Sequence, residues 1–271
     1  MVTEEDSKSI QPFKPNQPDL TKVKLDPGNQ FSSDTKNKLM AIVRDHSVIF
    51  QDDLPGYNNF HGKVEAGFEW ATKARPQPIK ARQPDYNKAG NKLYKDKCRE
   101  LISKGVLVKA GDMNIQPRLK NNAFLVKKQS AILKHWDQCS IKDVRLVTSF
   151  QVLQKFILNV PAKVINKENI HQRLSNWKYM AEIDFTNIFY QLKLRKKEAK
   201  DLDKLSYLAI QSDLGTLIYV RGPQGLPGIS EYQEELTDVV LGDMVMKGDA
   251  VKFADNVFIG GSSEQEFVSN F

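Results

Sequence analysis

Two aspartates stand where strand ends could bring carboxylates together. Asp184 closes the apolar run MAEID, and Asp255 occupies the tip of a hairpin pattern in KFADNVFIGG. Carboxylate oxygens are the hard ligands that Mg²⁺ prefers, and Mg²⁺ keeps open positions for substrate phosphates. A pair of such ions can activate a hydroxyl nucleophile and stabilise a leaving pyrophosphate. Each aspartate taken alone also fits a simple role as a turn residue, so the surrounding sequence must decide between the two interpretations.

The charge of the chain is distributed unevenly. The 271 residues carry 40 Lys and Arg against 33 Asp and Glu, a net charge of +7. Residues 73–145 hold 18 basic and 6 acidic residues, whereas residues 231–271 hold 2 basic and 9 acidic residues. A basic first part and an acidic last part favour a polyanion held next to a carboxylate site. Solvated helix faces are the alternative explanation, because charge by itself is a weak signal.

Five segments in a fixed order resemble the reverse transcriptases of gypsy-type LTR retrotransposons and retroviruses. AEIDFTNIFYQL is similar to the first catalytic motif of that family, RGPQGLPG to its Pro-Gln-Gly loop, and KFADN to its aromatic-x-Asp-Asp hairpin. Upstream, NNAFLVKK and DVRLVTSFQVLQK resemble the strands that hold the incoming nucleotide. The resemblance runs over roughly residues 73–271, and five matches in order are far more specific than any one of them.

The resemblance implies a role for each matching residue. Asp184 and Asp255 would bind two Mg²⁺ ions, with Mn²⁺ as a substitute, and the backbone carbonyl of Phe185 would supply a further oxygen. The aromatic ring of Phe189 would lie where a ribose 2′-hydroxyl would go, which favours deoxynucleotides; a purely structural core aromatic is the alternative.

Four further residues would contact the nucleotide. Gln224 would touch it directly, and Gly225 would allow a close approach of the backbone. Lys128 and Arg145 would bind the triphosphate, because a guanidinium fork matches phosphate oxygens. An exposed surface pair is the alternative for these two basic residues.

Two departures from the family pattern bear on activity. Asn256 stands where the motif has a second aspartate, so the site holds one fewer negative charge. The chain also ends 16 residues after Asp255, which leads us to expect an incomplete palm and no thumb. We therefore expect weak or undetectable polymerisation. The rival hypothesis is a non-catalytic retroelement remnant that binds nucleic acid or a protein partner.

The mixed order of helices and strands predicts an α+β fold. The resemblance implies that this fold consists of reverse-transcriptase fingers and an incomplete palm, a partly complete antiparallel sheet backed by helices. We expect an N-terminal extension or linker over residues 1–72 and the fingers and palm over residues 73–271. Ser33 is expected to cap a helix over 33–50, and the Ser230-x-x-Gln233 capping box to open a helix with Tyr232, Leu236 and Val240 inward. The other expected elements are a helix over 87–104, strands at 106–108, 123–126, 144–148, 180–185 and 216–220, a helix-like turn at 185–192 and a hairpin over 251–259.

The expected partners follow from the same resemblance. They are an RNA or DNA template with its primer, deoxynucleoside triphosphates and the rest of a Pol polyprotein. No apolar run approaches the eighteen or so residues of a spanning helix, so we expect no membrane partner. The polar N-terminus and two cysteines without a C-x-x-C pair favour an intracellular location, cytoplasmic or nuclear.

Overall fold

The computed structural model describes the chain in eight stretches: residues 20, 23–47, 66–79, 81, 84–160, 167–185, 187–253 and 256–271. Its α-helices are α1 (Ser33–Asp45), α2 (Lys88–Ser103), α3 (Gln151–Gln154), α4 (Lys167–Ser175), α5 (Ile188–Gln191), α6 (Ala199–Leu205), α7 (Ile229–Lys247) and α8 (Glu264–Asn270). Its strands are β1 (Leu107–Lys109), β2 (Lys120–Lys127), β3 (Val144–Ser149), β4 (Tyr179–Asp184), β5 (Ala209–Ser212), β6 (Gly215–Tyr219), β7 (Ala250–Phe253) and β8 (Asn256–Gly261). Short 3₁₀ turns lie at η4 (Ala110–Met113), η5 (Gln129–Ala131), η6 (Trp136–Gln138) and η7 (Ile141–Asp143).

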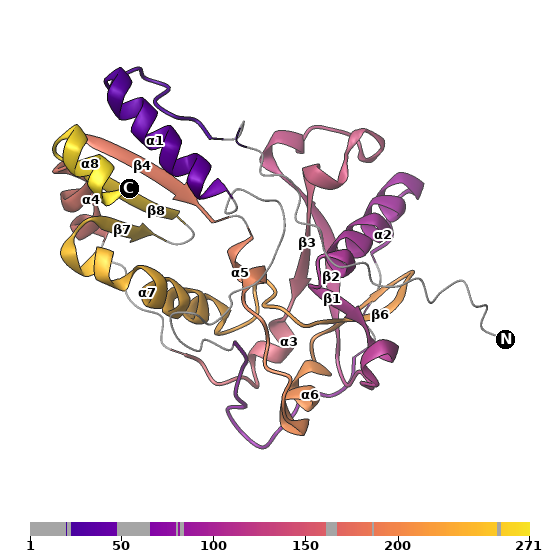
Figure 1. Cartoon of the computed structure of the whole chain (residues 1–271). Helices are drawn as coiled ribbons and strands as arrows, with labels where there is room; N and C mark the ends of the chain where they lie inside the picture. The colour runs from indigo at the N-terminus through magenta and orange to yellow at the C-terminus, as the bar shows by residue number, and fades with distance from the viewer. Residues whose placement is uncertain are drawn as a thin grey trace.

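The strands form two sheets, and the helices pack on each of them (Figure 1). The larger sheet has the order β1-β6-β5-β2-β3, and the smaller has the order β4-β8-β7. Within the larger sheet only β2 and β5 run parallel, which makes it a mixed sheet. Helices and mixed strands without a strict βαβ alternation confirm the predicted α+β class.

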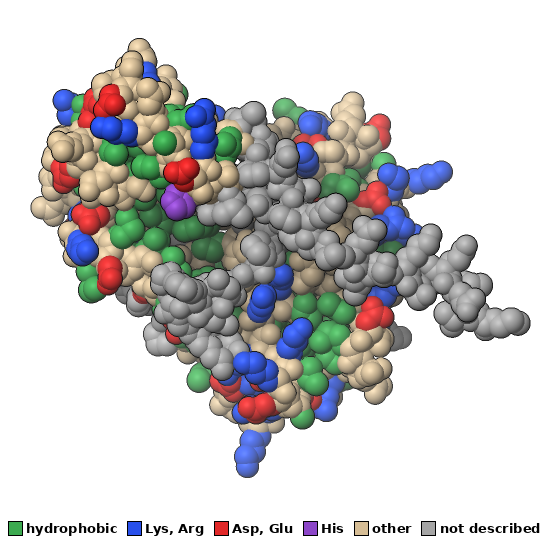
Figure 2. Space-filling model, viewed as in Figure 1, with side chains coloured by type: hydrophobic (Ala, Val, Ile, Leu, Met, Phe, Trp, Pro, Cys, Tyr) green, Lys and Arg blue, Asp and Glu red, His purple; other side chains and the backbone are tan. Residues whose placement is uncertain are grey.

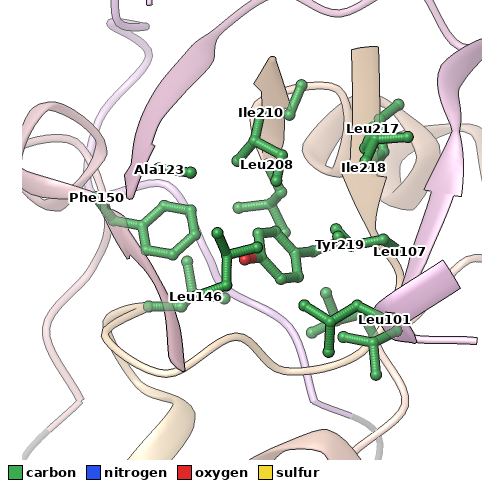
Figure 3. Packing of buried hydrophobic residues seen from close by; sticks show 14 of the residues in the cluster. Leu101, Leu107, Ala123, Leu146, Phe150, Leu208, Ile210, Leu217, Ile218 and Tyr219 are labelled. Atoms are coloured by element: carbon green, nitrogen blue, oxygen red, sulfur yellow. The ribbon is translucent and has the colours of Figure 1, made fainter. Parts of the chain in front are cut away.

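The main hydrophobic core joins the larger sheet to α2. Tyr94, Cys98 and Leu101 of α2 are buried at helical spacing, and the side chain of Asn87 caps the helix by accepting from the Gly90 amide. Figure 3 shows Leu101 near Leu107 and Tyr219, at one side of the packed sheet residues. The Tyr219 hydroxyl, which is fully buried, is paired with the Thr148 hydroxyl at 2.9 Å. Pairing satisfies a polar group whose burial would otherwise be unfavourable.

The smaller sheet has one covered face and one open face. Ala250, Val257 and Ile259 are buried against Leu241 and Met244 of α7. Residues alternate between the two faces of a strand, and β4 follows this rule with a strict intermediate-then-exposed pattern. The open face is therefore the one that carries every second residue of β4, ending at its C-terminal residue.

The segment before α2 packs on both sheets. The ring of Phe31 stacks on Tyr179 of β4 and on Phe267 of α8, with centroids 5.2 and 5.4 Å apart. Ala66 and Phe68 are buried in the main core. The boundary at residue 72 stays a prediction, but these contacts show described parts of residues 1–72 packed against the remainder of the chain.

One carboxylate of this segment links it to two cationic side chains. Glu69 contacts the Lys204 ammonium at 2.7 Å and the Arg195 guanidinium at 3.1 Å. Burial raises the pKa of the Glu69 carboxyl, but the two cations outweigh it and hold that pKa below its ordinary value. A carboxyl with a depressed folded pKa stabilises the fold above its unfolded pKa, and that contribution is lost as the pH falls through the folded value.

We expect Glu69→Gln to lower the free energy of unfolding at pH 7 by about 0.2–1 kcal/mol, the range of exposed ion pairs. Urea unfolding of both proteins at pH 7 and at pH values below 4.5 measures the difference. The gap between wild type and variant should shrink on acidification, because the wild-type carboxyl becomes protonated. A gap of constant size across this range would show that the ion pairs do not contribute to stability.

Several helix boundaries differ from the sequence expectations. The N-cap of α1 is Ser32, whose side chain accepts from the Thr35 amide, and the helix ends at Asp45. Helix α7 begins at Ile229 behind Gly228, whose φ of +82° makes a left-handed entry without a side-chain cap, so the predicted capping box is wrong. Val240 is exposed, while the polar Gln233 and Thr237 are buried.

The remaining expected elements are present with small shifts. The helix at 87–104, the paired strands β2 and β3 and the hairpin of β7 and β8 are confirmed. The helix-like stretch after Asp184 forms only the single turn α5. Strand β5 and the helices α3, α4, α6 and α8 were not predicted. No helix in the described stretches has both the length and the apolar character needed to cross a membrane.

Candidate active site

The register of the smaller sheet brings the first catalytic motif to the hairpin. Asp184, the last residue of β4, lies directly opposite Asn256, the first residue of β8. Asn256 also lies opposite Phe253, the last residue of β7. Ala254 and Asp255, between these two strands, lie outside the described residues. The expected convergence of Asp184 and Asp255 therefore stays a prediction, although the sequence neighbour of Asp255 is the residue that faces Asp184.

A second carboxylate shares the open face with Asp184. Glu182 lies two residues earlier on β4, and both side chains are exposed. The Asn256 side-chain amide donates to a carboxylate oxygen of Glu182 at 2.7 Å. Glu182 was not predicted from the sequence, although the period-2 alternation of a strand ending at Asp184 points to it.

The donor atoms of these side chains are of the types that bind a hard divalent cation. Glu182 and Asp184 offer carboxylate oxygens and Asn256 offers an amide oxygen, which are the donors that Mg²⁺ and Mn²⁺ take. Within the described stretches, no three His, Cys, Asp or Glu side chains are placed to hold a metal ion. A complete site therefore needs a further ligand, and Asp255 is the sequence candidate. The side chain of Phe185 packs against the smaller core, and the role of its carbonyl stays a prediction.

Phe189, the residue predicted to exclude a ribose 2′-hydroxyl, lies on a turn with a constrained backbone. Phe189 lies in α5, behind Asn187 with a φ of +54°, and its ring is partly buried against the main core. A Cβ atom on Gly222 would lie 2.9 Å from the Phe189 carbonyl oxygen and 2.4 Å from Ile229 Cδ1. Only glycine fits at that position without movement of its neighbours. Gly222 therefore allows the Pro-Gln-Gly loop to pack closely against the turn that carries Phe189.

The Pro-Gln-Gly loop reaches the edge of the larger sheet. Gly225 has a φ of +89°, and a Cβ atom there would lie 3.7 Å from the Thr148 carbonyl oxygen of β3. The side chain of Gln224 is exposed beside it. The loop thus lies between the strand that carries Arg145 and the helix α7 that covers the smaller sheet. Direct contact of Gln224 and Gly225 with a nucleotide stays a prediction.

Lys128 and Arg145 emerge on one exposed face of the β2–β3 pair. Arg145 lies opposite Val126, and the Lys128 amide donates to the Asp143 carbonyl at 2.8 Å, so Lys128 and Arg145 lie diagonally across the strand pair. Phe124 and Val126 are also exposed on this face. Two cations above an apolar strip are a surface on which a phosphate chain and a stacked ring could both bind.

The connection between β2 and β3 is held in shape by one carboxylate. Asp143 accepts from the Ser140 amide at 2.8 Å and the Ser140 hydroxyl at 2.9 Å, and it pairs with Lys134 at 3.1 Å. Hydrogen bonds from Ser140, followed by the pairing with Lys134, lower the pKa of Asp143 to about 2. The Lys127 ammonium lies 4.7 Å from the centroid of the Trp136 ring, in position for a cation–π contact.

The basic residues are less concentrated than their count suggests. In Figure 2, Lys and Arg side chains are spread over the part of the molecule that holds the larger sheet, interleaved with Asp and Glu. A shallow groove of about 630 Å³ on the outer side of α2 has such a mixed lining, with Lys92 and Arg99 both paired to Asp96. It contains none of the predicted site residues, so it does not define the reaction centre.

Comparisons with known proteins give a likeness in structure alone. No family model and no curated protein match the sequence. The protease-reverse transcriptase of prototype foamy virus, a CSH mutant, superposes with a TM-score of 0.69 at 14% identity, over 89% of this chain and 29% of that chain. The foamy viral enzyme named dRH, in complex with double-stranded DNA, gives 0.66 at 18% identity, over 95% and 42%. The foamy viral enzyme with an RNA/DNA hybrid gives 0.64 at 19%, over 95% and 32%.

The chain has a retroviral reverse-transcriptase-like fold. It spans less than half the length of these foamy viral chains. The larger sheet with α2 carries the segments expected to form the fingers, and the smaller sheet with α7 carries those expected to form the palm, so the two parts are called the fingers and the palm from here on. The open palm face carries Glu182, Asp184 and Asn256, and the exposed fingers face carries Lys128 and Arg145.

Proposed function

We propose that this chain is the fingers and palm portion of the Pol polyprotein of a gypsy-type or retrovirus-like element, and that it carries out template-directed DNA synthesis. The observation that carries the proposal is the pairing of Asp184 with Asn256 at the open end of the palm sheet. This pairing sets the first catalytic motif beside the hairpin that contains Asp255, within a reverse-transcriptase-like fold.

Each residue of the site has a definite task under this proposal. Asp184 and Asp255 would hold two Mg²⁺ ions, which supply activation of the primer hydroxyl and stabilisation of the pyrophosphate when bound. Lys128 and Arg145 orient the triphosphate from the fingers. The ring of Phe189 excludes the 2′-hydroxyl of a ribonucleotide. Gln224 and Gly225 line the nucleotide from the loop between the two sheets.

The proposed macromolecular substrate is a primer annealed to an RNA or DNA template. Two of the structural neighbours were solved with double-stranded DNA and with an RNA/DNA hybrid. Residues 73–145, with 18 basic and 6 acidic side chains, would contribute most of the affinity. Because binding releases counterions from the nucleic acid, the affinity should fall steeply with salt.

Arg145→Ala is expected to weaken binding of an incoming deoxynucleoside triphosphate by about 10-fold or more, because a charge-assisted contact to phosphate is worth about 1.5–3 kcal/mol. Fluorescence titration of a labelled nucleotide against a protein–primer–template complex measures this effect. Lys142→Ala is the matched control, since Lys142 is an exposed cation three residues earlier. Equal losses in the two variants would remove Arg145 from the proposed triphosphate site.

Primer extension on RNA and DNA templates, with Mg²⁺ and separately with Mn²⁺, tests the function itself. Template-directed incorporation above that of Asp184→Asn supports the proposal. Salt-sensitive binding of the primer–template without incorporation under either metal would favour the rival function, a non-catalytic nucleic-acid binder. The neutral Asn256 is the structural feature that favours this rival.

A further inference from the structure

The amide of Asn256 is oriented by its neighbour. Its Nδ2 atom donates to Glu182 Oε1 at 2.7 Å. An ionised carboxylate has no proton to donate, so the end of the amide that faces Glu182 must be the NH₂ group. The nitrogen and oxygen of an asparagine side chain are ordinarily assigned from their partners, and here the partner leaves one assignment. The oxygen Oδ1 therefore faces away from Glu182.

The β4–β8 register indicates which way the Asn256 amide faces along the strand pair. Glu182 lies two residues back along β4, diagonal to Asn256, whereas Asp184 lies directly opposite it. Because the NH₂ group lies toward Glu182, we expect Oδ1 on the side of the strand end. That end carries Asp184 and is continuous in sequence with Asp255. A side chain that could present either end to a bound cation thus presents its oxygen.

We propose that Glu182 is a positioning residue that holds the Asn256 amide with its oxygen toward the metal site. The inference rests on the proposed function and deepens it. The Glu182–Asn256 pair replaces a carboxylate at position 256, with the oxygen coming from Asn256 and the negative charge from Glu182. The two residues are matched, because an aspartate at position 256 would set two carboxylates in contact within the protein when no cation lies between them.

The first test reads the hydrogen bond directly. The side-chain NH₂ resonance of Asn256, assigned by its loss in Asn256→Asp, is observed by NMR in ¹⁵N-labelled protein. Glu182→Gln and Glu182→Ala are expected to shift it, since glutamine can donate as well as accept and alanine can do neither. Glu235→Gln, which neutralises an exposed carboxylate on α7, is the matched control and should leave the resonance in place.

The second test is a reciprocal exchange read by Mn²⁺ binding. Electron paramagnetic resonance titration compares wild type, Glu182→Gln, Asn256→Asp and the double variant. Glu182→Gln is expected to weaken Mn²⁺ binding by about 10–100-fold, as the loss of outer-shell partners of metal ligands does. The double variant should bind at least as tightly as wild type. In that protein the glutamine introduced at position 182 can donate to the carboxylate introduced at position 256, which keeps one negative charge in the pair.

The two tests separate the inference from the function beneath it. An Asn256 resonance that does not respond to Glu182→Gln overturns the inference, even if wild type binds Mn²⁺ and extends primers. Strictly additive effects of the two substitutions on Mn²⁺ binding overturn it as well. Absence of both Mn²⁺ binding and primer extension in wild type overturns the proposed function, and a responsive resonance would then report a structural hydrogen bond alone.

Discussion

Asp184→Asn is expected to lower the weak Mn²⁺-supported primer extension of wild type by about 10²–10³-fold or more. Removal of a single preorganised electrostatic contact to a transition state commonly has an effect of this size. Asp184 is an exposed carboxylate at the very end of β4, opposite Asn256. Because Asn256 is already neutral, loss of the Asp184 charge leaves the open palm face with few anionic oxygens for a cation.

The substitution should leave the fold intact, since the side chain of Asp184 is exposed and the new residue has the same shape. Urea unfolding of the variant should therefore agree with wild type within about 0.5 kcal/mol, as for most surface substitutions. Asp137→Asn, an exposed aspartate in η6 of the fingers, is the matched control for primer extension. Extension by Asp184→Asn at the rate of Asp137→Asn would exclude Asp184 from the reaction.

Ile218→Ala is expected to lower the free energy of unfolding by about 2–5 kcal/mol. Ile218 is wholly buried in β6, between Val108 of β1 and Ala209 of β5. Figure 3 places it in the packed layer of the fingers sheet, beside Leu217. The strands on either side limit how far the surroundings can collapse into the space left by the missing methylene and methyl groups.

Denaturant titration followed by tryptophan fluorescence measures this loss, with Leu133→Ala as the matched control. Leu133 is 94% exposed in the loop after η5, so its truncation should change the free energy of unfolding by no more than about 0.5 kcal/mol. A loss below about 1 kcal/mol for Ile218→Ala would mean that the fingers core is not packed as described.

Local sequence patterns were sufficient to predict the strands of the palm but not all of the elements around them. The apolar run in MAEID and the turn before NVFIGG were sufficient to predict β4 and the hairpin of β7 and β8, because both patterns depend on neighbouring residues. Strand β5 was missed because LAIQS is a short buried run without alternation, which periodicity alone does not distinguish from a helix. The start of α7 at the left-handed Gly228 was missed because Ser230-x-x-Gln233, two residues later, matches the capping-box pattern.

The candidate site shows the same division. The positions of Asp184 and Asn256 follow from strand ends, whereas the hydrogen bond from Asn256 to Glu182 depends on a register between strands 74 positions apart. The role of Gly222 was also missed, because the atoms that exclude a side chain there belong to Phe189 and Ile229. Patterns along the chain carry little information about such non-local contacts.

The contact of the N-terminal segment with α8 has a consequence for the order of folding. Glu264 accepts hydrogen bonds from the amide and hydroxyl of Ser32, which caps α1, although the two residues are 232 positions apart. A 13-residue helix is marginal in water without a packing partner. At synthesis rates of about 5–20 residues per second, α1 waits roughly 10–50 seconds after it is made before α8 emerges. Helix α1 therefore docks on α8 long after it is made, and until then its apolar face is open to chaperones and proteases.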